Sequence, residues 1–225
     1  MCERDFFLFA KLTKVRCTET MITTIFFDAD GVLIKSKHLF SEGLERDFGI
    51  DINKMLPFFT GVFRECGIGK ADLKEELGKV IGDWGWKGTV EELMRYWFTT
   101  YTKIDEEMAE YVLRLRSRGI RVYMTTDQEK YRGENLRNAL EGKMFDMIFF
   151  SSEVGRRKDT VEFWQHVYAK VNNLHATKKE EILFVDDNED NISVAALFGL
   201  KTYLYRGDLN DLKESIAFLT GTANA

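Results

Sequence analysis

The sequence predicts a doubly wound α/β fold, in which helices cover a parallel five-stranded sheet, with a helical subdomain inserted into it. Five short apolar runs have the length of strands and lack polar alternation, which is typical of parallel strands buried on both faces. Segments with helical spacing of apolar residues lie between these runs. Between the first two runs, about 70 residues of helical pattern replace the much shorter connection that an ordinary crossover needs.

The strands are predicted at residues 24–27, 120–124, 147–150, 182–185 and 202–205, all rich in β-branched or aromatic residues. Helices of the same unit are predicted at residues 106–118, 160–171 and 208–219. The first of these helices ends in a basic turn and Gly119, and the last has Asp208 as a candidate N-cap. We therefore expect residues 21–35 and 105–225 to form one α/β core.

The insertion is predicted to span residues 36–104, with helices at 39–48, 55–64, 71–81 and 90–101. A cluster of glycine and tryptophan at residues 82–88 predicts a turn packed by Trp84 and Trp86. Residues 1–20 precede the first strand and are interpreted as an upstream extension or an arm docked on the surface.

Composition and charge exclude several classes of protein. The chain has 37 acidic and 32 basic residues, and a net charge of −5 has the wrong sign for binding a nucleic-acid backbone. No apolar run approaches the roughly 18 residues of a membrane span, and we expect a cytoplasmic protein with no membrane partner. The three cysteines lie far apart and predict neither a disulfide framework nor a zinc site. A small soluble substrate fits this composition best.

Reactive side chains follow four of the five predicted strands. Asp28, Asp30 and Gly31 follow the first strand, and the pair Asp186 and Asp187 follows the fourth. Two further groups follow the second strand and the third: Thr125, Thr126 and Asp127, and then Arg156, Arg157 and Lys158. Because ligands of open parallel sheets bind outside the carboxyl ends of the strands, we expect these groups to meet in one site.

Four converging carboxylates require a counter-ion. Two of them at about 4 Å repel by roughly 4 kcal/mol at an effective dielectric of about 20. A ligand set made of oxygen, without histidine or cysteine, favours a hard cation, and a site that also binds phosphate favours Mg²⁺. The sequence therefore predicts Mg²⁺ as the cofactor.

The same residues resemble the motifs of the haloacid dehalogenase superfamily of phosphotransferases. The resemblance spans about residues 21–219 and lies in Phe-Phe-Asp28-Ala-Asp30-Gly-Val-Leu, the threonine after strand two, the lysine before a helix, and Phe-Val-Asp186-Asp187 followed by Asn191 and Gly199. The insertion also lies where the type-one cap of the family is found. The resemblance implies a Rossmann-like core with a helical cap.

A carboxylate can attack a phosphate ester in line, and Asp28 would form an aspartyl-phosphate. Asp30 would protonate the leaving oxygen and later accept a proton from water, with a pKa raised by its acidic neighbours. The resemblance implies that Asp28, the backbone carbonyl of Asp30 and Asp187 bind the metal and that Asp186 supports them. It also implies that Thr126 binds the phosphoryl group and that Lys158 neutralises it and steadies Asp28.

Two positions depart from the pattern of the family. Asp159 replaces the usual proline after the lysine, and we expect it to cap the next helix while placing an acid beside Lys158. Thr125, Thr126 and Asp127 stand where one threonine or serine followed by asparagine is commoner. Thr126 fits the spacing better as the phosphate ligand, and Thr125 stays open, with Asp127 beside them as a further substrate contact.

The sequence thus predicts a Mg²⁺-dependent phosphatase that acts on a small phosphorylated metabolite. The alternatives are a sugar phosphomutase of the same superfamily and, from another class, a catalytically silent module that binds phosphate or metal. The insertion would act as a lid over the site. Its candidate substrate contacts, together with those at its entry, are Lys35, His38, Arg64 and Lys70.

Overall fold

Five parallel strands form the central sheet, in the order β3-β2-β1-β4-β5, which confirms the predicted α/β class. The computed structural model describes residues 20–35 and 39–221. His38 and all but the last residue of the 1–20 segment lie outside the described residues. The strands are β1 (Thr24–Phe27), β2 (Arg121–Thr126), β3 (Met147–Phe150), β4 (Ile182–Asp186) and β5 (Lys201–Leu204).

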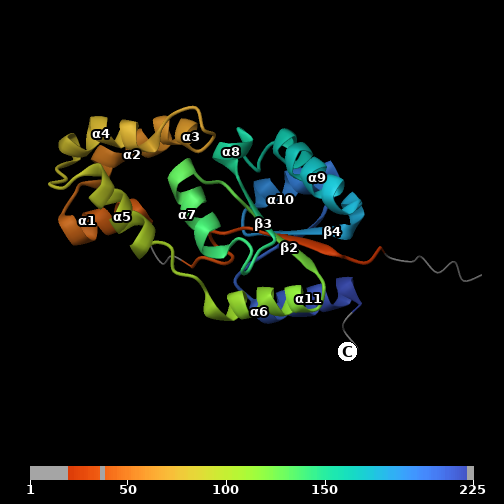
Figure 1. Cartoon of the computed structure of the whole chain (residues 1–225). Coiled ribbons are helices and arrows are strands. Elements are labelled where there is room, and N and C mark those ends of the chain that lie inside the picture. The colour runs from red at the N-terminus through yellow and green to blue at the C-terminus, as the bar shows by residue number, and fades with distance from the viewer. Residues whose placement is uncertain (1–19, 36–38, 222–225) are drawn as a thin grey trace, which may run out of the picture.

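Helices cover both faces of the sheet, as Figure 1 shows. Alternate strand residues point to opposite faces: Ile25 and Phe27 belong to one core cluster and Phe26 to the other. The first cluster is completed by α6 (Glu106–Ser117), α7 (Lys130–Leu140) and α11 (Leu209–Thr220), and the second by α9 (Val161–His175) and α10 (Glu189–Phe198). The short helices α8 (Ser151–Val154) and η1 (Lys179–Glu181) lie in the connections. In the strand order, β1 is the central strand, so its carboxyl end lies at the middle of the sheet edge.

Helices α1 to α5 form the cap and pack around their own core at one end of the molecule (Figure 1). Aromatic side chains dominate this core; the rings of Phe40 and Trp97 stack with centroids 4.2 Å apart. The predicted helix at 55–64 is two helices, because the backbone at Gly61 (φ −106°, ψ −111°) leaves the helical region. The cap helices are α1 (Phe40–Phe48), α2 (Ile52–Thr60), α3 (Val62–Cys66), α4 (Leu73–Trp84) and α5 (Val90–Thr100).

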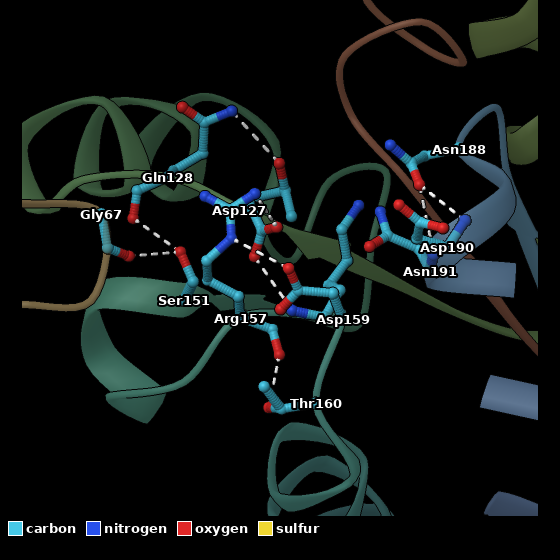
Figure 2. Close-up of polar contacts among 12 residues, drawn as sticks. Gly67, Asp127, Gln128, Ser151, Arg157, Asp159, Thr160, Asn188, Asp190 and Asn191 are labelled. Carbon is cyan, nitrogen blue, oxygen red and sulfur yellow. Dashed lines mark hydrogen bonds and ion pairs between the residues drawn. The ribbon is translucent and has the colours of Figure 1, made fainter. Parts of the chain in front are cut away.

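Polar contacts join the cap to the core besides the connecting chains. The Ser151 hydroxyl at the start of α8 donates to the carbonyls of Gly67 at 2.5 Å and of Gln128 at 3.3 Å (Figure 2). The Tyr131 hydroxyl of α7 donates to the N-cap carboxylate of Asp72 at 2.7 Å. These contacts hold the cap over the carboxyl ends of the strands.

None of the helices in residues 20–35 and 39–221 combines the length and apolar character that crossing a membrane requires.

Candidate active site

Three carboxylates meet at the carboxyl ends of the neighbouring strands β1 and β4. Asp28 follows β1 directly, Asp186 ends β4, and the register pairs Phe27 with Val185, so the two strands end at the same level. Asp28, Asp186 and Asp187 each offer one carboxylate oxygen, and these oxygens all lie within 4.8 Å of one another. Asp28 and Asp186 are buried, whereas Asp187 is exposed. The parallel pairing alone thus brings together the acids of two distant motifs.

Lys158 lies in the loop before α9, and its ammonium bridges two of these acids. Its Nζ lies 2.5 Å from Oδ1 of Asp28 and 2.7 Å from Oδ2 of Asp186, and the side chain is only 2% exposed. Burial alone would lower the pKa of Lys158, but the charges of Asp28 and Asp186 outweigh it and raise the pKa above its usual value. Lys158 is therefore a permanent cation beside Asp28.

One ammonium does not balance three carboxylates. Burial raises the pKa of Asp28 despite the opposing charge of Lys158, and the pKa of Asp187 is raised by burial and by the charge of Asp186. Both shifts mean that burial, together with the neighbouring carboxylates, disfavours the ionised form of these side chains. Because the donors are all oxygens and one of them is exposed, the cluster fits a hard divalent cation such as Mg²⁺.

Gly31 leaves the space that Asp187 occupies. Its φ is +83°, a conformation that side chains rarely adopt, and a Cβ there would lie 2.0 Å from Oδ2 of Asp187. Any side chain at this position would therefore push the Asp187 carboxylate away from the cluster.

Gly31→Ala is expected to weaken Mg²⁺ binding at least about tenfold, because the misplaced carboxylate loses its geometry for the metal. Isothermal titration with Mg²⁺ measures this affinity. The matched control is Gly82→Ala on the exposed side of the last turn of α4, where a Cβ meets no atom within 4 Å. Unchanged Mg²⁺ affinity in Gly31→Ala would show that Asp187 does not bind the metal.

Asp30 is held by two residues of the segment after β2. Nη1 and Nη2 of Arg132 lie 2.7 and 2.6 Å from its two carboxylate oxygens, and Nε2 of Gln128 donates to it at 2.6 Å. Burial would raise the pKa of Asp30, but the hydrogen bonds and charge of Arg132 outweigh it and hold the pKa below its usual value. The expectation of a raised pKa was therefore wrong for this arrangement, because the sequence did not reveal the guanidinium partner.

Asn188, in the loop after β4, and Asn191, in the first turn of α10, fix the position of Asp186. The Asn191 amide donates to its Oδ2 at 3.1 Å, and the backbone N–H of Asn188 donates to its Oδ1 at 2.7 Å. Asn188 also caps α10, accepting from the backbone N–H groups of Asp190 and Asn191 (Figure 2). Asp186 thus accepts from Lys158, Asn188 and Asn191, which suits a supporting residue of the cluster.

The two threonines after Met124 are the last residues of β2 and differ in what they face. Thr126 lines the cleft above the acids, and its Oγ1 accepts from Gln128 at 3.2 Å. Thr125 is fully buried, and its hydroxyl has no hydrogen-bond partner among the described residues. Asp127 lines the cleft too and accepts from the backbone N–H of Lys158 at 3.1 Å. This placement favours Thr126 as the phosphate ligand.

The lysine loop keeps its geometry without the usual proline. Asp159 pairs with Arg157 at 3.5 Å, and Arg157 in turn pairs with Asp127 at 3.2 Å (Figure 2). The indole N–H of Trp164 donates to the carbonyl of Lys158 at 2.9 Å. The N-cap of α9 is Thr160, so the prediction that Asp159 caps this helix was wrong: its carboxylate pairs with Arg157 instead.

A cleft of about 950 Å³ lies between these residues and the cap. Lys35 lines it, but its ammonium forms an ion pair with Asp105. Arg64 and Lys70 do not belong to its lining, because Arg64 is exposed on α3 and Lys70 lines a separate pocket near Asp72 and Arg137. The cap side is lined by Leu39, Phe40, Ser41, Glu42, Leu56, Phe59, Phe63, Trp97 and Tyr101.

The sequence interpretation missed Arg132 and Asn188 as site residues, and gave Gln128 no role. An arginine on a helix is by default a surface residue, and here it is buried only because α7 begins at the edge where the acids gather. The one indication in the sequence was that Arg132 lies soon after the carboxyl end of β2, in the first turn of α7.

Comparisons with known proteins agree with this geometry. A family model described as haloacid dehalogenase-like hydrolase matches residues 22–199. The chain is 26% identical over 196 residues to the D-ribitol-5-phosphate phosphatase of Bacteroides thetaiotaomicron, covering 81% of this chain and 91% of that relative. It is 33% identical over 97 residues to the sesquiterpene phosphatase astK of Aspergillus oryzae, a match that covers 43% of this chain and just under half, 47%, of the length of astK.

A solved structure of a haloacid dehalogenase family enzyme from Bacteroides thetaiotaomicron, in complex with magnesium and inorganic phosphate, shares the fold. Its TM-score is 0.68 at 20% identity, and the match covers 85% of this chain and 98% of that one. The magnesium in that structure agrees with the cofactor predicted from the sequence. Because the family model matches most of the chain, this protein belongs to the haloacid dehalogenase-like hydrolases.

Proposed function

We propose that this protein is a Mg²⁺-dependent phosphatase that hydrolyses a small phosphate monoester through an aspartyl-phosphate on Asp28. The observation that carries the proposal is the place of Asp28: it lines the cleft, is paired with the buried cation Lys158, and lies within a cluster of carboxylates that fits a divalent cation. Both relatives described above are named as phosphatases, which supports phosphate-ester hydrolysis.

The metal would be held by Asp28, Asp187 and the backbone carbonyl of Asp30, with Asp186 orienting the cluster. When bound, Mg²⁺ would neutralise part of the charge on the phosphoryl oxygens. Lys158 contacts Oδ1 of Asp28 and would hold this carboxylate in position for attack on the phosphorus of a bound ester. Thr126 lines the same cleft and would donate to a phosphoryl oxygen.

Asp30 would serve as acid and then as base. In the observed arrangement it is bound by Arg132 and kept ionised, which suits the step in which it accepts a proton from the attacking water. To protonate the leaving oxygen, Asp30 must first take up a proton. Turning away from Arg132 would raise the pKa of Asp30, which favours the protonated acid. Arg132 is thus proposed as a positioning residue for both half-reactions.

Arg132→Met is expected to lower kcat about 10- to 100-fold with a smaller change in KM, because Asp30 loses two charge-assisted hydrogen bonds. Arg114→Met on the exposed side of α6 is the control. Because Arg132 is expected to act through Asp30, the double variant with Asp30→Asn should be no slower than Asp30→Asn alone. If the losses of kcat caused by Arg132→Met and Asp30→Asn were fully additive, Arg132 would not act through Asp30.

The proposed function is tested by phosphate release from p-nitrophenyl phosphate, after EDTA treatment and again after Mg²⁺ is restored. We expect turnover only with the divalent ion. A panel of sugar phosphates, followed for both phosphate release and isomer interconversion, separates a phosphatase from a phosphomutase. Failure to release phosphate from every ester in the presence of Mg²⁺ would reject the proposal.

A further inference from the structure

The cap wall of the cleft is mainly apolar among the described residues. Phe59 and Phe63 of α2 and α3 line it together with Trp97 of α5, and all three belong to or pack against the aromatic core of the cap. Leu39 and Leu56 line it as well, yet they are 68% and 45% exposed. Their exposure is not explained by packing within the cap, and large apolar side chains exposed around a cleft mark a binding surface.

Polar side chains on this wall are few: Ser41, Glu42 and Tyr101. Among the described residues of α1 that line the cleft, Ser41 and Glu42 are polar, and the Glu42 carboxylate accepts from the backbone N–H of Leu39 at 3.0 Å as part of the helix cap. At the entry to the cap, the Lys35 ammonium pairs with Asp105. A polyol placed here would bury hydroxyl groups against aromatic rings with few partners, which is unfavourable.

The polar and apolar parts of the cleft are continuous. Asp28, Thr126 and Lys158 form the end that would bind the phosphoryl group, and the aromatic wall of the cap forms the other side of the same space of about 950 Å³. A phosphate bound beside Asp28 would therefore direct its organic group toward the cap wall. This volume is at the upper end of the range for small-molecule sites, so it admits a leaving group larger than a triose or a tetrose.

We infer that the substrate is a phosphate monoester whose leaving group is a hydrocarbon chain rather than a polyol. The inference rests on the proposed function and names the substrate class for that same site. The cap wall would bind the hydrocarbon by burial, while the residues around Asp28 bind and transfer the phosphoryl group. Selectivity would then lie in the length and apolar character of the alcohol.

A series of straight-chain alkyl phosphates tests the preference for a hydrocarbon leaving group. Hydrolysis of ethyl, butyl and octyl phosphate is compared with that of D-ribitol 5-phosphate. All esters are kept below the concentration at which octyl phosphate forms micelles. Burial of one methylene group can raise kcat/KM by up to about fourfold, which corresponds to a free energy of about 0.8 kcal/mol. We expect kcat/KM to rise at least about 50-fold from ethyl to octyl phosphate and to exceed that for D-ribitol 5-phosphate. A flat series, or a preference for D-ribitol 5-phosphate, would overturn the inference.

Leu56→Asp tests the cap wall directly. Leu56 is already 45% exposed, so its replacement by a charged residue does not disturb the core of the cap as the mutation of a buried residue would. We expect the ratio of kcat/KM between octyl and ethyl phosphate to fall at least about tenfold. Leu113→Asp on α6 is the matched control, since Leu113 is 43% exposed and lies outside the cleft. An unchanged ratio in Leu56→Asp would remove Leu56 from the binding surface and contradict the inference.

Binding of alkylphosphonates separates this inference from the proposed function. Octylphosphonate and methylphosphonate cannot be hydrolysed, and isothermal titration in Mg²⁺ measures their affinity without turnover. Tighter binding of octylphosphonate would support the apolar site even if no ester were hydrolysed, in which case the proposed function alone would fail. Equal affinity of the two phosphonates would reject the apolar site even in an active phosphatase.

Discussion

Asp28→Asn is expected to lower kcat for phosphate-ester hydrolysis by at least about 10⁴-fold, because the amide cannot attack phosphorus. The amide keeps the shape of the side chain, so the loss reports chemistry rather than folding. The control is Asp159→Asn, which changes the acid next to Lys158 in the sequence, whose carboxylate pairs with Arg157. We expect less than a twofold change there.

Thermal unfolding provides a second readout for Asp28→Asn. Burial raises the pKa of Asp28 to about 8, so keeping this carboxyl group ionised at neutral pH costs the folded state free energy. Replacing it with a neutral amide is therefore expected to leave Tm without metal unchanged or higher, while Mg²⁺ raises Tm less than in the wild type. An active Asp28→Asn protein would exclude Asp28 as the nucleophile.

Lys158→Met is expected to lower kcat at least about 100-fold and to destabilise the fold. Lys158 is the cation that bridges Asp28 and Asp186, and its removal leaves two buried carboxylates without it. Breaking a buried ion pair by removing one partner costs roughly 3–5 kcal/mol. Urea unfolding and steady-state kinetics measure the two effects, with Lys170→Met on the exposed side of α9 as the control.

The pH dependence of Lys158→Met has a definite sign. Burial raises the pKa of Asp28 and Lys158 opposes this, so removal of the ammonium raises the pKa of Asp28 further above its unfolded value and its ionisation opposes folding more strongly. The stability deficit against the wild type should therefore be largest at neutral and alkaline pH and shrink as the pH falls and Asp28 protonates. A deficit that does not change with pH would show that Lys158 acts through packing alone.

The strand-end acids could be predicted from the sequence because the topology leaves them little freedom. Strands of a parallel sheet end at one edge, so Asp28 and Asp186, more than 150 residues apart in the sequence, were expected to meet and do meet. The loop of Lys158 is also close to the sheet edge by connectivity. Local pattern and topology together therefore predicted the cluster around the proposed nucleophile.

The partners from helices could not be predicted in the same way. Which face of a cap helix lines the cleft depends on how the whole cap packs, and this packing turns Phe63 toward the cleft and leaves Arg64 exposed on the same helix. The aromatic residues of the insertion were interpreted as its core, whereas several of them also line the cleft. Arg132 was hidden for the same reason, since burial of a helical arginine is a tertiary effect.

Trapping of the covalent intermediate tests the central claim most directly. An aspartyl-phosphate is an acyl phosphate, and borohydride added during turnover reduces such a group to an alcohol, which converts the aspartate to homoserine. We predict homoserine at position 28 in peptide mass spectra of the wild-type protein quenched in the presence of Mg²⁺ and substrate, and none in Asp28→Asn. Homoserine at another carboxylate such as Asp187, or unmodified Asp28 in a protein that is turning over substrate, would contradict the account.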